Sequence, residues 1–116
     1  MENDRLALKG ATYRYSTSTG TAFITLNRCG AAQDLIEVFC NVGKAGSSVY
    51  DFSEAIGRLV SLALQMPDNL PADERAKLVI KQLRDIGGDR QSVPDAVAKA
   101  LEIELEEDNG RQTVAD

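Results

Sequence analysis

The chain has 116 residues, of which 43% are hydrophobic and 27% are charged, and its net charge is −5. This composition is that of one folded domain, and its acidity argues against partners such as nucleic acid or an anionic membrane surface. With no histidine and only two cysteines, one copy cannot build a His-based triad, a His-metal site or a four-cysteine zinc site.

The N-terminus is polar and acidic, and we expect residues 1–9 to be flexible. No apolar region of an export signal follows it, and no stretch is apolar for long enough to span a membrane. Two cysteines are too few to cross-link a secreted scaffold. These features predict a cytoplasmic protein.

Three stretches show the alternating pattern of β-strands. Residues 12–17 and 22–27 flank a turn that contains Gly20, which predicts a hairpin. A third strand is predicted over residues 35–42. Its expected buried face consists of Ile36, Val38, Cys40 and Val42.

A helical period follows, and it predicts one helix that ends before Pro67. Gly57 lies inside this helix and predicts close packing against a neighbouring element, because glycine at such a position otherwise costs about 1 kcal/mol. The expected apolar face consists of Val49, Phe52, Ile56, Leu59, Val60 and Ala63.

Two further helices are predicted. The first follows Pro71, stops at Gly87, and has an expected apolar stripe of Leu78, Val79, Leu83 and Ile86. The second begins with Ser92 as its cap and Asp95 three residues later. Its expected apolar residues are Val93, Val97, Leu101 and Leu105.

This order predicts an α+β fold, in which a three-stranded antiparallel β-meander precedes three α-helices packed on one face. We expect one domain over residues 10–107 and a flexible tail over residues 108–116. A three-stranded sheet has two edges, and edges are commonly covered by pairing with another chain. The sheet edges and the Gly57 face are therefore the interfaces expected for a homo-oligomer.

The loop before the first helix is the strongest candidate for a binding site. It contains Gly43, Lys44, Gly46, Ser47 and Ser48. Glycines allow backbone N–H groups to turn inward, and a lysine, two hydroxyl groups and a helix N-terminus would add to a site for a phosphate. The alternative is a tight turn in which the glycines adopt positive φ and a serine caps the helix. The loop does not have the spacing of a Walker A motif.

The other reactive side chains have structural interpretations as well. Cys40 is expected to be a buried thiol, and Cys29 lies in a predicted loop, where it is either incidental or redox-active. Tyr13 and Tyr15 either pack on the sheet or offer a surface on which a base could stack.

Four stretches in this order resemble the TSCPD domain, which occurs near the C-terminus of adenosylcobalamin-dependent (class II) ribonucleotide reductases and in small separate proteins. They are residues 10–15 (GATYRY), 36–47 (IEVFCNVGKAGS), 54–64 (EAIGRLVSLAL), and 80–88 (IKQLRDIGG) with 92–101 (SVPDAVAKAL).

The chain departs from this family at its cysteines. Val93 replaces the cysteine that precedes Pro-Asp in the family motif, and residues 87–90 lack a second family cysteine. Metal binding and disulfide exchange therefore do not carry over from the family. The reductase barrel with its radical cysteine and cobalamin site is also missing, so the domain alone is not expected to reduce ribonucleotides.

The resemblance implies an accessory, non-catalytic protein that contacts a class II reductase chain and has no cofactor of its own, adenosylcobalamin belonging to the partner. Two alternatives stay open. One is a regulator that binds a nucleotide through the loop at residues 43–48, and the other is a homo-oligomeric interaction module.

Overall fold

The chain folds into a three-stranded antiparallel sheet followed by three helices, the α+β order predicted from the sequence. The computed structural model describes residues 8–115, with side chains as far as residue 107. Residues 1–7, most of the segment predicted to be flexible, lie outside the described residues. The elements are β1 (Lys9–Thr17), β2 (Gly20–Cys29), β3 (Asp34–Val42), α1 (Ser48–Leu64), α2 (Ala72–Leu83) and α3 (Val93–Ala115).

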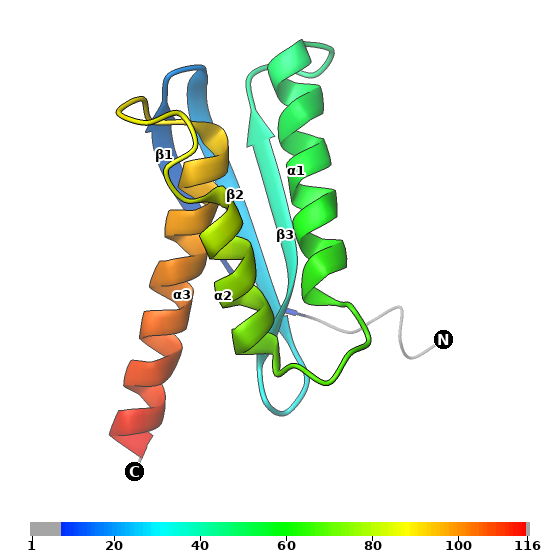
Figure 1. Cartoon of the computed structure of the whole chain (residues 1–116), viewed down its shortest axis with the longest axis vertical. Coiled ribbons are helices and arrows are strands. Elements are labelled where there is room, and N and C mark those ends of the chain that lie inside the picture. The colour runs from blue at the N-terminus through cyan, green and yellow to red at the C-terminus, as the bar shows by residue number, and fades with distance from the viewer. Residues whose placement is uncertain (1–7, 116) are drawn as a thin grey trace.

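The helices occupy two positions around the sheet, as Figure 1 shows. α2 and α3 lie over one face, and α1 runs beside β3. The core forms under α2 and α3, where the side chains of Ala22, Ile24 and Leu26 in β2 are fully buried. The apolar residues predicted for the last helix are also buried in this core: Val93, Val97, Leu101 and Leu105.

α1 lies along the free edge of β3 and closes the core from that side, with Val60 and Leu64 buried in it. The Ser61 hydroxyl accepts a hydrogen bond from the Val38 N–H (2.8 Å) and donates one to the Val38 carbonyl (3.1 Å). The Ser53 hydroxyl accepts from the Val42 N–H (3.2 Å). Serine side chains on α1 thus satisfy backbone groups that the outermost strand would otherwise expose.

Gly57 is the point of closest approach between α1 and β3, as the sequence predicts. A Cβ atom at this position would lie 2.9 Å from the Val38 carbonyl oxygen and 3.1 Å from the Cys40 nitrogen. The Gly57 face and the β3 edge therefore cover each other within one chain. The expectation that the Gly57 face and the β3 edge serve as interfaces with another copy is therefore wrong. β1 forms the other edge of the sheet, and for that edge the expectation stays a prediction.

The alternation of buried and exposed residues in β3 shifts by one residue near the start of the strand. Asn27 pairs with Glu37 but Arg28 pairs with Leu35, so Ile36 is an extra residue that has no partner in the ladder. Leu35 consequently joins the buried face at 1% exposure, and Ile36 is only partly buried. The rest of the predicted face is buried as expected: Val38, Cys40 and Val42.

The apolar stripes predicted for the first two helices are only partly in the core. Several of their large members are exposed, namely Phe52, Leu59, Leu78 and Ile86. The buried positions of α1 are Ser53, Gly57, Val60 and Leu64, and those of α2 are Ala72, Ala76 and Ile80. Both helices approach the strands closely through small residues, and this orientation turns larger apolar side chains outward.

The start of α3 follows its predicted cap, because the Asp95 N–H donates to the Ser92 hydroxyl (3.2 Å). The Asp95 carboxylate does not complete a capping box. It accepts a hydrogen bond from the Asp85 N–H (2.8 Å) at the start of the connection between α2 and α3. α3 continues to Ala115, beyond the predicted domain end at residue 107. The flexibility expected for residues 108–116 stays a prediction.

Candidate functional site

The loop that joins β3 to α1 forms a tight turn and a helix cap. Gly43 and Gly46 have φ angles of 76° and 91°, which favour glycine. The Ser47 N–H and hydroxyl both donate to the Lys44 carbonyl, at 3.1 and 2.8 Å. The same hydroxyl accepts from the Tyr50 N–H (3.2 Å) as the N-cap of α1. Of the two interpretations of this loop, the geometry therefore shows the tight turn with a serine cap.

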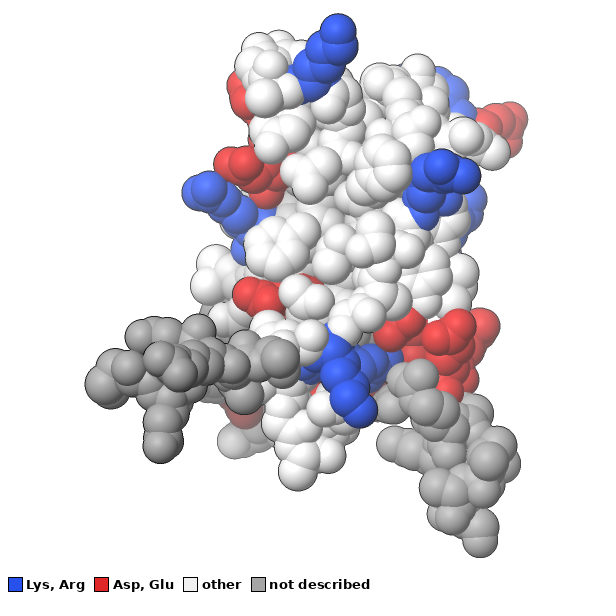
Figure 2. Space-filling model, turned by 180° about the vertical axis from the view of Figure 1, so that it is seen from behind, with Lys and Arg blue, Asp and Glu red and all other residues white. Residues whose placement is uncertain are grey.

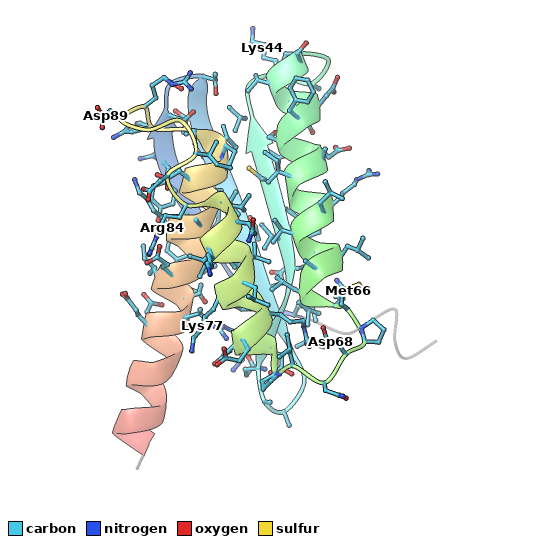
Figure 3. All side chains as sticks on the ribbon, viewed as in Figure 1. Lys44, Met66, Asp68, Lys77, Arg84 and Asp89 are labelled. Atoms are coloured by element: carbon cyan, nitrogen blue, oxygen red, sulfur yellow. The ribbon has the colours of Figure 1, made fainter. Side chains whose placement is uncertain are left out.

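The structure places all five predicted phosphate-site residues at the N-terminal end of α1. Lys44 is exposed and extends from the outer end of the loop, away from the body of the domain (Figure 3). The Ser47 hydroxyl is occupied by capping, whereas Ser48 is exposed. Phosphate binding at this loop stays a prediction.

A groove lies between α1 and the sheet face that α2 and α3 leave open. It has a volume of about 410 Å³. Glu37 and Phe39 line it from β3, and Glu54, Arg58 and Leu62 line it from α1. The Arg58 guanidinium lies 3.1 Å from the Glu54 carboxylate, and this charge pair shares the α1 wall with Leu62 and the polar Ser61 and Gln65. The groove is suited to receive protruding side chains of another protein.

Two phenylalanines lie on the open sheet face beside this groove. Phe23 is 47% exposed and Phe39 is 52% exposed. They belong to adjacent strands, since Phe39 pairs with Thr25, two residues along β2 from Phe23. Figure 2 shows this side of the molecule largely uncharged over its centre, with one acidic group inside the face and most charged side chains toward its border. Exposed aromatic side chains on an uncharged surface are typical of protein interfaces.

This surface was not predicted from the sequence. The signal was present in β2, where Ala22, Ile24 and Leu26 occupy the buried side of the alternation. Phe23 therefore falls on the opposite side, which is otherwise polar. One exposed aromatic side chain is ordinary, but two of them on neighbouring strands form an apolar patch of the kind that marks interaction sites.

A buried ion pair joins the end of β2 to α3. Arg28 and Glu104 are each 5% exposed, and two guanidinium nitrogens lie 3.1 and 3.2 Å from one Glu104 oxygen. Arg28 also donates to the Gln33 carbonyl (2.8 Å), and the Tyr13 hydroxyl donates to the other Glu104 oxygen. Burial and the Glu104 carboxylate raise the pKa of Tyr13. This network fixes α3 against the sheet.

The cysteines and the other tyrosine have structural positions. Cys40 is 2% exposed, and burial raises the pKa of its thiol to about 11, so it stays protonated at neutral pH. Cys29 is partly buried at the end of β2, and neither cysteine forms a disulfide. The rings of Tyr13 and Tyr15 stack with their centroids 6.4 Å apart, and both side chains pack against the core. Packing is thus the role that the structure shows for both rings.

Neither a metal site nor a membrane-spanning helix is present among the described residues. No group of three or more His, Cys, Asp or Glu side chains among them has the arrangement of a metal site. No helix within residues 8–115 has the length and apolar character needed to cross a membrane.

The fold and these surfaces define a small α+β module whose most distinctive features are exposed apolar surfaces. The model of the TSCPD domain family matches residues 4–105, nearly the whole chain. The chain therefore belongs to the TSCPD domain family. No curated protein and no solved structure gives a significant match.

Proposed function

We propose that this chain is an accessory, non-catalytic partner of an adenosylcobalamin-dependent ribonucleotide reductase and that it acts by protein–protein contact in the cytoplasm. Membership of the TSCPD family supports the choice of partner, because the resemblance associates these domains with class II reductases. The cofactor and the reacting groups belong to the reductase. Two free cysteines are consistent with a reducing compartment.

The exposed aromatic pair on the open sheet face is the observation that carries this proposal. Phe23 and Phe39 each expose about half of their surface, and the groove that reaches α1 adjoins Phe39. Aromatic side chains in a partly hollowed surface are the residues that dominate the free energy of binding in protein interfaces. We assign this face to the reductase.

Calorimetric titration with the purified catalytic chain of the class II reductase from the same source tests the assignment. The parent protein is expected to bind at tens of micromolar or tighter. Phe39→Ser is expected to weaken binding at least tenfold, because truncation of a central aromatic residue costs about 2 kcal/mol or more. Leu78→Ser, at a 52% exposed position of α2, is the matched control and should bind like the parent. Equal binding by both variants would contradict the assignment.

A second candidate function is binding of a nucleotide phosphate by the loop at residues 43–48. The observation that favours it is the exposed Lys44 beside the N-terminus of a 17-residue helix, where backbone N–H groups carry partial positive charge. Under this function, nucleotides raise the melting temperature of the parent protein by a few degrees. Lys44→Ala removes the shift, and Lys81→Ala, another exposed lysine, retains it. A parent protein that no nucleotide stabilises would rule this function out.

A further inference from the structure

α1 carries an apolar stripe on the side that faces away from the sheet. Phe52, Leu59 and Leu62 are 70%, 65% and 60% exposed, and Met66, just after the helix, is 49% exposed. We call these residues, together with the exposed Ala55, the α1 stripe. Their spacing is three, four, three and four residues, which is the heptad pattern of a helix that packs against another helix.

The stripe has no covering element within the described chain. The buried side of α1 contains Gly57 and Val60, which face β3. At about 100° per residue, the centre of the stripe points roughly opposite to that buried side. Figure 1 shows α1 as the outermost helix beside β3, with α2 and α3 on the sheet face. The side of α1 that has the pattern of a helix–helix contact therefore faces away from the domain.

We propose that the α1 stripe binds the same stripe of a second copy, with the two helices antiparallel about a two-fold axis near Gly57. The spacing from Phe52 to Leu62 is three, four and three residues, and it reads the same in both directions. An antiparallel copy thus places Phe52 opposite Leu62, and Ala55 opposite Leu59. Both contacts occur twice, as a two-fold interface requires, and small Ala55 makes room for Leu59.

The charges around the stripe are compatible with this pairing. The stripe itself contains no charged residue. Arg58 lies beside it near the proposed axis, and its guanidinium is 3.1 Å from the Glu54 carboxylate of the same helix. Each arginine therefore brings its own counter-charge to the axis, which reduces the repulsion between the two copies.

The area of the stripe sets the expected strength of the dimer. Burial of its four large side chains on both copies would remove on the order of 1,000 Å² from water, which lies at the lower end of specific interfaces. The dimer is therefore reversible, and its population depends on concentration. It uses the outer side of α1, which shares only Leu62 with the groove beside the face assigned to the reductase.

Sedimentation equilibrium of the full chain over a range of concentrations tests the proposal. The weight-average mass of the parent protein rises toward twice the monomer mass, whereas Leu59→Glu stays monomeric because a charge replaces a central apolar contact. Leu78→Glu, at an exposed leucine of α2, is the matched control and dimerises like the parent. Circular dichroism verifies that each variant folds. A parent protein that is monomeric at hundreds of micromolar, or a Leu59→Glu variant that dimerises normally, would overturn the proposal.

Spin labels test the antiparallel orientation. In a Cys29→Ser background, a label at Arg58→Cys lies close to its counterpart. A label at Asp51→Cys is about 18 Å from its counterpart along the helix axis, since both lie six residues from the axis position. Equal, short separations at both positions indicate parallel helices and would contradict the proposed axis.

Reductase binding separates this proposal from the proposed function. Leu59→Glu should bind the reductase chain like the parent, and Phe39→Ser should dimerise like the parent. If the parent is monomeric and Leu59→Glu loses binding to the reductase, the stripe belongs to the reductase interface and the proposed dimer is wrong.

Discussion

Replacement of Glu104 by alanine is expected to lower the free energy of unfolding by about 3–5 kcal/mol, because it removes the buried carboxylate that two guanidinium nitrogens of Arg28 contact. Arg28 is 5% exposed, and the change also removes the acceptor for the Tyr13 hydroxyl. Such a loss is a large part of the total stability of a domain of this size, about 5–15 kcal/mol. Urea denaturation measures it, and a loss below about 1 kcal/mol would show that the pair does not anchor α3.

Two further variants separate the charge effect from packing. Arg28→Met combined with Glu104→Leu replaces both charges by apolar groups, and it should recover most of the lost stability. Tyr15→Phe removes a buried hydroxyl that has no hydrogen-bond partner among the described residues, so it should leave stability unchanged or slightly raised. If the double variant is as unstable as Glu104→Ala, the loss comes from packing instead of the broken contact between the two charges.

Gly57→Val is expected to destabilise the domain by about 3 kcal/mol, because the new side chain enters space that β3 occupies. A Cβ atom already meets the Val38 carbonyl oxygen at 2.9 Å. Displacement of α1 would break its serine hydrogen bonds to β3 and expose a strand edge. The variant should therefore also aggregate on warming, which light scattering during thermal unfolding detects.

Arg58→Val is the matched control for this change. It places the same side chain on the next residue of α1, where the arginine side chain is 79% exposed. Its expected cost is below about 1 kcal/mol, from helix propensity and the loss of a surface ion pair. Similar losses from the two variants would mean that Gly57 is not a contact point.

Predictions of buried residues and helix ends from the sequence are most accurate where local pattern and tertiary environment agree. The buried residues of α3 and its Ser92 cap were predicted because both depend on neighbours within a few positions. The outward face of α1 was not predicted, since hydrophobic period alone cannot show that a helix docks through Ser53 and Gly57 on a strand edge. Ile36 was predicted on the buried face, which Leu35 occupies instead, because one extra residue reverses the alternation.

The candidate sites also differ in whether they depend on local pattern or on contacts between distant parts of the chain. The loop at residues 43–48 could be located from its glycines and serines, and Ser47 is the cap. The partnership of Arg28 and Glu104 spans 76 positions in the chain, and no local pattern links them. That Phe23 and Phe39 lie on one surface could be recognised only from the strand register, which places β2 beside β3.

Sedimentation velocity of the labelled full chain, with increasing amounts of the purified class II reductase catalytic chain, tests directly whether this domain is a protein-binding module. The label is expected to move with the large reductase chain at tens of micromolar, and Phe39→Ser is expected to prevent this movement. If the parent protein sediments as free chain at every reductase concentration, the domain does not bind the reductase.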